Sequence, residues 1–486
     1  MRRRDFLKTT AAAAGSLAFG AWGSPPDATS RELLLGRGQR AENVLEIFLY
    51  GGLGPFESFY VVERHGGPGS DYPNEQFHLF SADHEDVFGV CGLSSPWLVP
   101  LGLDGAGEMV NLGPLLAPLI ARPDIVSRMR VLVHRHSLEP HEAAIPYALS
   151  GHRLGSARMA GLGAAVQRHC QARDGGQRRV PYSHVLYPDT EISTDNLRAA
   201  SAVGMHPGAA RPLQLRISED MSGLYRSLLR PNVGSRRDAY DALVAHYASA
   251  AEARYTGQRA VALDDYLRAS AAVREADALE AVLAEEALSP VDGEACATRG
   301  FSTTATGLKL ATHLLTHPSV PSRHVTVVDG GLIPASGGGG YDVHSAHLVD
   351  TARNLTHTLS ALADQIQRPG TAGGGIDLDE TMVVLNTEFG RTPYRQQFSP
   401  DGTNHHPYGY VTVLIGGPAE PGVLGAIDSD GVARRYVTPP ESRAAVLAAM
   451  GIYPFTDATF AVGDLRAADD ERDGLAWLNE IVLGRR

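Results

Sequence analysis

The chain has 486 residues, of which 43% are hydrophobic and 20% are charged, as in an ordinary soluble globular protein. This length allows one large α/β domain or two smaller ones. The formal net charge of -12 argues against nucleic acid as a partner. An acidic protein can still bind a small anion in a local cationic or metal-rich pocket. Beyond the N-terminal segment, no run approaches the roughly 18 apolar residues of a membrane-spanning helix, so no transmembrane anchoring is expected.

The first 27 residues have the pattern of a targeting segment. The run Arg3–Lys8 (R-R-D-F-L-K) resembles the twin-arginine export signal, and a short, mildly apolar stretch follows it. We therefore expect residues 1–27 to be a signal peptide, and the mature protein to be exported already folded to the periplasm or beyond the cell. The alternative is a basic tail on a cytosolic protein.

Strand and helix patterns alternate along the first and last thirds of the chain. This alternation predicts an α/β fold with a doubly wound, mostly parallel sheet between helical layers. The expected strands are Glu42–Tyr50, Val131–Val133, Val180–Leu186, His324–Asp329, Thr381–Leu385 and Tyr410–Ile415. The expected helices begin near Leu112 and cover Ala305–Thr316, Leu348–Gln367 and, as the last helix, Glu441–Met450.

Two other stretches have a different character. Residues 66–108 are rich in Gly, Pro and Asp and predict a surface excursion. Residues 218–290 are dominated by Ala, Leu, Glu and Arg with apolar positions at helical spacing, which predicts a helical insertion of two to four helices. Those helices either form a cap over the site or pack as an outer layer of the sheet.

The three cysteines, Cys91, Cys170 and Cys296, have no paired spacing. This excludes a zinc-finger or thioredoxin-type motif, and at most one disulfide can form.

Three polar clusters follow predicted strands or precede a predicted helix. Asp342 and His344 lie in the first, Glu388 and Arg391 in the second, and His405 in the third. Ligands of open α/β sheets bind outside the carboxyl ends of the strands, so these clusters are expected to meet. Carboxylates and imidazoles on separate loops are donors that suit Zn²⁺, Mn²⁺ or Fe. Each histidine alone is more often a polar surface residue, or a neighbour of a ligand, than a metal ligand itself.

From Glu42 to the C-terminus the chain resembles the exported DUF1501 family. The resemblance rests on Gly51–Phe59 (G-G-L-G-P-F-E-S-F), His141–Gly151 (H-E-A-A-I-P-Y-A-L-S-G), Tyr341–His344 (Y-D-V-H), Thr387–Pro393 (T-E-F-G-R-T-P), Gly402–His405 (G-T-N-H) and Ile415–Gly417 (I-G-G). It implies a single domain over residues 42–486. The family looks like a distant branch of the alkaline phosphatase and sulfatase superfamily, which implies an alkaline-phosphatase-like fold with metal ligands on loops at the strand ends.

The resemblance also implies a divalent-metal site. Its ligands would fall on Glu57, Asp342, His344, Glu388 and His405. Two departures reduce this set: Phe389 stands in the place of a ligand histidine, and Asn404 stands where the family often has Asp.

His141 occupies the position of the sulfatase nucleophile, ten residues before Gly151. Imidazole can accept a phosphoryl group but cannot be the hydrated aldehyde of a sulfatase, so phosphate is favoured over sulfate. We expect His141 or metal-activated water to attack. Arg391 either holds the anion of the substrate or pairs with a neighbouring carboxylate. Ser137, beside His136, does not form a dyad by local spacing, because adjacent residues on a strand point to opposite faces.

Two functions remain open from the sequence. The first is a metal-dependent hydrolase of a small or polymer-borne anionic ester. The second is a non-catalytic exported binding or assembly protein on a degenerate phosphatase scaffold, because a shared fold does not transmit activity. The oligomeric state and the substrate are not encoded in these patterns.

Overall fold

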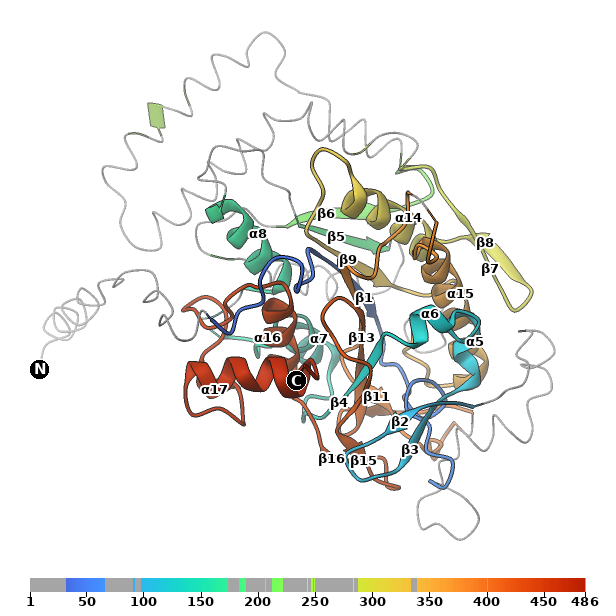
Figure 1. Cartoon of the computed structure of the whole chain (residues 1–486). Coiled ribbons are helices and arrows are strands. Elements are labelled where there is room, and N and C mark those ends of the chain that lie inside the picture. The colour runs from blue at the N-terminus through green and yellow to red at the C-terminus, as the bar shows by residue number, and fades with distance from the viewer. Residues whose placement is uncertain are drawn as a thin grey trace, which may run out of the picture.

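A computed structural model gives the architecture (Figure 1). It describes residues 32–65, 91, 98–156, 158, 160–173, 183–188, 206, 212–221, 243, 246, 247, 249, 283, 287–333, 339–371, 373–399 and 401–485. The predicted signal peptide and most of the predicted helical insertion at about 218–290 lie outside the described residues.

An eight-stranded sheet forms the centre of the molecule. Its strands in spatial order are β14 (Gly422–Leu424), β4 (Met129–His134), β13 (Tyr410–Gly416), β10 (Thr381–Asn386), β1 (Asn43–Leu49), β9 (His324–Asp329), β5 (His184–Pro188) and β6 (Leu213–Ile217). Neighbouring strands pair in parallel, except that β13 runs antiparallel to both β10 and β4. The expectation of a mostly parallel α/β sheet is therefore confirmed.

Both faces of the sheet are covered by helices (Figure 1). In β1, Leu45 and Ile47 point into one core with α14 (Thr303–Thr316) and α15 (His347–Gln365). Val44 points into the opposite core with α8 (Leu162–Arg173) and α16 (Pro439–Ala449). This two-sided burial follows from the period of two along a strand, and it explains why the β1 and β10 sequences are almost continuously apolar.

Shorter elements surround this frame. They are the hairpin β2 (Val99–Leu103) and β3 (Met109–Leu112), η1 (Pro114–Leu116), α5 (Ala117–Ile120), α6 (Pro123–Val126), α7 (His141–Ser150), the hairpin β7 (Asp292–Ala295) and β8 (Thr298–Phe301), the pair β11 (Gly390–Arg391) and β12 (His405–His406), the pair β15 (Ala426–Ile427) and β16 (Ala433–Arg435), η3 (Val462–Asp464), α17 (Glu471–Ala476) and the π-helix η4 (Trp477–Val482).

Two element predictions were wrong. The helix expected to begin near Leu112 is the end of β3 followed by the short turns η1 and α5, because Gly113 and Pro114 interrupt a continuous helix. The helix at Glu441–Met450 is not the last, because α17 and η4 follow and pack on α16. Their apolar residues Leu475, Leu478 and Val482 complete the core on that face of the sheet.

Cys91 and Cys296 form a disulfide that links residues 205 positions apart, while Cys170 keeps its thiol. Disulfides persist mainly in oxidising compartments, so this bond agrees with an exported protein. Within the described part of the chain, no helix combines the length and apolarity needed to cross a bilayer.

A buried ion pair crosses the face of the sheet beneath α16. Arg443 donates a hydrogen bond to Glu46 on β1, and both side chains are about 1% exposed. Asn386 donates a second hydrogen bond to Glu46 over 3.0 Å. His324 on β9 has its Nε2 3.8 Å from Glu46, and neither of its ring nitrogens has a hydrogen-bond partner among the described residues. Burial, the Arg443 charge and His184 lower the pKa of His324 to about 3.

This buried histidine predicts sensitivity to acid. The pKa of His324 lies below the unfolded value of about 6.5, so its share of the stability is complete above pH 6.5 and is lost as the pH falls toward 3. In His324→Leu, the free energy of unfolding should fall less steeply as the pH is lowered than in the unsubstituted protein. The difference between the two slopes should be about 1.4 kcal/mol per pH unit. Urea unfolding between pH 7 and pH 5 measures this slope.

His134 on β4 provides the comparison, because burial, Arg443 and His136 also lower its pKa to about 3. His134→Leu should flatten the slope by the same amount, and the double variant by twice as much. An unchanged slope in both single variants would show that these imidazoles take up protons in the folded protein.

Candidate metal centre

The polar residues gather where the parallel strands end. Residues 50–52 follow β1, residues 387–389 follow β10, and residues 339–346 lie between β9 and α15. His141 is the first residue of α7, and His405 lies on β12. Close backbone approach requires glycine here: a Cβ atom on Gly51, whose φ is +107°, would lie 2.1 Å from the backbone nitrogen of Asp342.

Asp342 is the centre of the cluster. Its Oδ1 lies 2.7 Å from Nη2 of Arg391, 3.0 Å from Nε2 of His344 and 3.3 Å from Nε2 of His405. Its Oδ2 lies 3.4 Å from Nε2 of His141. Burial alone would raise the pKa of Asp342, but its hydrogen bonds to the three histidines and the Arg391 charge hold it far below the usual range. The carboxylate is therefore ionised at any physiological pH.

His141 bridges two carboxylates. Its Nδ1 lies 2.9 Å from Oε1 of Glu388, and that oxygen also accepts a 2.8 Å hydrogen bond from the backbone N–H of Gly51. A carboxylate oxygen can only accept, so His141 carries a proton on Nδ1 and its Nε2 faces Asp342. Burial lowers the pKa of His141, but the hydrogen bonds to Asp342 and Glu388 outweigh this and raise it to about 9.

His405 has the same arrangement. Its Nδ1 lies 3.0 Å from the backbone carbonyl of Glu139, and its Nε2 lies 3.3 Å from Oδ1 of Asp342. Both oxygens can only accept a hydrogen bond, and the shorter contact favours the proton on Nδ1. Burial lowers the pKa of His405, Asp342 opposes this, and Arg391 and His141 lower it further. The imidazole is therefore neutral near pH 7, and its Nε2 faces Asp342.

His344 has the opposite tautomer. The side-chain nitrogen of Gln396 donates to the backbone carbonyl of Thr403, which fixes the orientation of the amide. The same nitrogen lies 2.8 Å from Nδ1 of His344, so this ring nitrogen accepts a hydrogen bond. The proton of His344 is then on Nε2 and is donated to Asp342. His344 therefore orients the carboxylate and offers no lone pair to a shared ligand.

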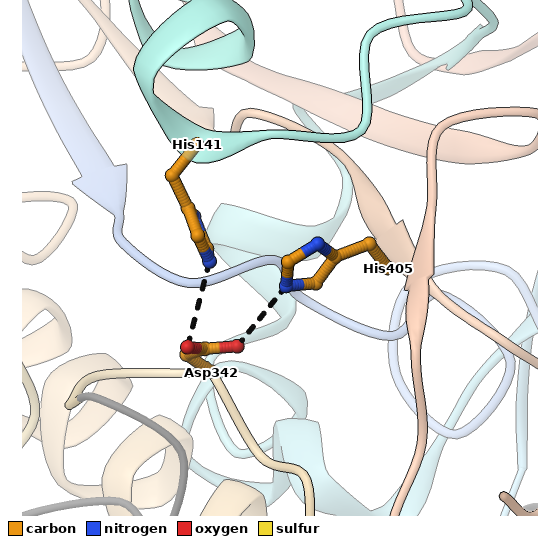
Figure 2. A group of neighbouring side chains, drawn as sticks. All are labelled: His141, Asp342 and His405. Carbon is orange, nitrogen blue, oxygen red and sulfur yellow. Dashed lines mark hydrogen bonds and ion pairs between the residues drawn. The ribbon is translucent and has the colours of Figure 1, made fainter.

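His141, Asp342 and His405 together can hold a metal ion (Figure 2). One ligand atom from each lies within 4.8 Å of the others, and the three side chains converge from different segments. Nε2 of His405 lies 3.3 Å from Oδ1 of Asp342 and Nε2 of His141 lies 3.4 Å from Oδ2, and two donors that each lie about 2.1 Å from a tetrahedral metal are separated by a similar distance of about 3.4 Å. Two imidazoles and one carboxylate suit Zn²⁺, Mn²⁺ or Fe²⁺ and leave coordination positions open.

The other predicted ligands have different neighbours. Glu388 is fully buried and contacts Nδ1 of His141. The His141 imidazole lies between the carboxylates of Glu388 and Asp342 and separates them. Glu57 is also fully buried, and its Oε1 lies 2.6 Å from Nε2 of His347, whose Nδ1 lies 3.0 Å from the Thr403 hydroxyl. The structure therefore places Glu57 on a neighbouring polar pair and does not group it with the three converging donors.

Arg391 is 0% exposed. Its Nη2 bonds to Asp342 and its Nε donates to the Tyr341 carbonyl over 3.2 Å, while Nη1 has no hydrogen-bond partner among the described residues. The sequence allowed Arg391 either to hold a substrate anion or to pair with a neighbouring carboxylate. The geometry matches the carboxylate pair, and the partner is Asp342, not Glu388.

Phe389 packs beneath the imidazoles. Its ring stacks on His405 at 4.4 Å between centroids and lies 5.0 Å from the ring of His141. A Cβ atom on Gly52 would lie 2.6 Å from Phe389, so this glycine makes room for the ring. The aromatic ring thus fixes the planes of two donor residues without supplying a donor.

Three contributors to the site were not found from the sequence. Gln396 and the carbonyl of Glu139 set the tautomers of His344 and His405, and only their distance in space shows this role. Tyr50 stacks on His141 with 5.5 Å between ring centroids. Burial and the charges of Glu388, Asp342 and Glu142 raise the pKa of its hydroxyl. The position of Tyr50 at the end of a predicted strand was the sequence feature that could have identified it as part of the site.

The fold and the cluster define an α/β protein with a histidine–carboxylate centre at the carboxyl ends of its parallel strands. Residues 110–472 match the family model described as a protein of unknown function, DUF1501. The chain belongs to this DUF1501 family, as the sequence motifs predicted. No curated protein and no solved structure matches the chain, so the relation to alkaline phosphatase stays a prediction.

The tautomers predict unequal effects of three histidine substitutions on metal affinity. His141→Ala and His405→Ala remove inward-facing Nε2 atoms and should each weaken Zn²⁺ binding by more than about 100-fold. His344→Ala removes only a hydrogen bond to a ligand and should cost about 10-fold, the lower end for residues that support a metal ligand. Competition titration against a chromophoric chelator measures these affinities.

His246→Ala, which removes an exposed histidine, is the control for non-specific zinc binding. Equal losses in His344→Ala and His405→Ala would contradict the assigned tautomers.

Proposed function

We propose that this DUF1501 protein is an exported metal-dependent hydrolase of phosphate esters, with a divalent ion held by His141, Asp342 and His405. The observation that carries this proposal is the convergence of two inward-facing Nε2 atoms on one ionised carboxylate. The disulfide between Cys91 and Cys296 supports export, and we retain the twin-arginine route and a periplasmic or extracellular location as part of the proposal.

The residues around the three ligands have supporting roles. Glu388 accepts the Nδ1 proton of His141, and the Glu139 carbonyl accepts that of His405. Metal-binding histidines commonly donate their second N–H in this way, which fixes the ring and increases its basicity. His141 must lose its Nε2 proton before it binds an ion, so ion binding displaces one proton there.

The site opens toward solvent at its histidines. The side chain of Asp342 is 9% exposed, whereas those of His141, His405 and His344 are 14, 23 and 35% exposed. A substrate can therefore approach from the side of His405 and His344, while Asp342 stays behind them. A divalent ion bound there supplies Lewis acidity and lowers the pKa of a bound water molecule.

Phosphate is favoured over sulfate because His141 stands at the nucleophile position of sulfatases and cannot be the hydrated aldehyde that they use. Hydrolysis adds the hydroxyl of water to phosphorus and breaks the bond to the alcohol oxygen, which receives the proton. In this proposal His141 holds the ion and is not the nucleophile, because both ring nitrogens face carboxylates. The alkaline-phosphatase-like arrangement of the fold belongs to the same proposal and is supported by the mostly parallel sheet.

A second candidate is a binding or assembly protein that holds the ion without hydrolysis. The full burial of Arg391 favours it, because a guanidinium that is 0% exposed and bonded to Asp342 cannot also hold a substrate anion. A small or polymer-borne anionic ester remains the ligand in either case.

Hydrolysis of an aryl phosphate monoester and an aryl phosphate diester distinguishes the two candidates. Protein isolated through its export route and loaded separately with Zn²⁺, Mn²⁺ or Fe²⁺ should release the aryl alcohol with at least one ion. Asp342→Asn should reduce kcat/KM by at least about 100-fold, because the amide loses the charge that binds the ion.

Asp379→Asn makes the same change on an exposed carboxylate and should leave the rate unchanged. Stoichiometric metal with no turnover of either ester would support the binding protein, and absence of bound metal would end both candidates.

A further inference from the structure

Tyr50 lies at the carboxyl end of β1, immediately before Gly51 and Gly52, and its ring packs between the core and the metal centre. It is 4% exposed and shares an apolar cluster with Ile145, Ala148 and Val328. Its ring stacks on the imidazole of His141, with 5.5 Å between centroids and 29° between planes. The ring is thereby held on two sides, so its position relative to the three metal-binding residues is fixed.

The hydroxyl of Tyr50 differs from those of two other buried tyrosines. Tyr60 donates to Asp104 and accepts from the backbone N–H of Ile427, and Tyr341 donates to Asp329. Among the described residues, none receives a hydrogen bond from Tyr50. Its oxygen is also not one of the fully buried side-chain atoms that lack a partner, so this rigidly held phenol can be reached by a partner outside the chain.

The chemistry of the Tyr50 side chain indicates what that partner needs. A phenol is protonated near pH 7, because its ordinary pKa is about 10, so Tyr50 offers a hydrogen-bond donor beside His141. An anion bound at His141, Asp342 and His405 lacks the donor that Arg391 would otherwise supply, because Arg391 is buried against Asp342. Tyr50 is the neutral donor that adjoins His141.

We propose that the Tyr50 hydroxyl contacts the substrate and donates a hydrogen bond to an oxygen of a phosphoryl group bound at the metal centre. This inference rests on the proposed function, because the anion is drawn to the site by the divalent ion. It adds a substrate-binding residue just after β1 to a site whose other members come from α7, β12 and the loop before α15. A phosphoryl oxygen accepts such a bond strongly because it is charged.

Calorimetric titration of inorganic phosphate into the zinc-loaded full-length protein tests this contact. Tyr50→Phe removes only the hydroxyl, so zinc affinity should stay within about twofold. The Kd for phosphate should rise by about 10-fold, the lower range for a lost hydrogen bond to a charged group.

Tyr187→Phe is the matched control, because Tyr187 packs against the same apolar cluster. It should change neither the zinc nor the phosphate affinity. Thermal unfolding of both variants detects a general loss of packing, which would lower the transition temperature and the zinc affinity together.

The outcomes separate this inference from the function on which it rests. Phosphate affinity that is unchanged in Tyr50→Phe, or reduced equally in Tyr187→Phe, would overturn the role of Tyr50 and leave the metal centre standing. Zinc binding without phosphate binding in the unsubstituted protein would also overturn it. Failure of the unsubstituted protein to bind zinc, manganese or iron would overturn the proposed function, and the role of Tyr50 with it.

Discussion

The ion pair between Asp342 and Arg391 is the interaction on which the rest of the site depends. The carboxylate is 9% exposed at its side chain and the guanidinium is 0% exposed, so neither charge is compensated by bulk water. Removing one partner of a buried pair leaves an unpaired charge, which costs several kcal/mol, about 3–5. The bond of 2.7 Å between them therefore fixes the loop that carries Asp342 to the segment that follows β10.

The three histidines around Asp342 depend on this anchor and on partners behind them. Glu388, the Glu139 carbonyl and Gln396 each bind the Nδ1 side of one imidazole and so decide what its Nε2 can do. The neighbouring pair of Glu57 and His347 attaches the loop after β1 to the start of α15 in the same way. The site is thus a set of loops whose relative positions are held by charge-assisted hydrogen bonds.

Periodicity and strand-end position predicted much of this arrangement, and for physical reasons. The strands at His324–Asp329 and Tyr410–Ile415 were found almost to the residue because β-branched and apolar runs bounded by Gly are unambiguous when both faces are buried. The helices after α16 were missed because their apolar residues alternate with charges in short turns. Tautomers could not be predicted, since they depend on contacts such as that of Gln396 with His344 across 52 positions.

The identity of residue 389 bears on how many ions the site can hold. Because Phe389 supplies no donor, the described donors that converge number three, enough for one ion with open positions. The neighbouring acidic groups are already compensated: Arg391 neutralises Asp342 on its buried side, and His347 binds Glu57. A second divalent ion beside Asp342 would meet the Arg391 charge at close range in a poorly solvated interior, where like charges repel strongly. The buried arginine thus occupies the electrostatic role that a second ion would have, so the proposed metal centre would hold a single ion.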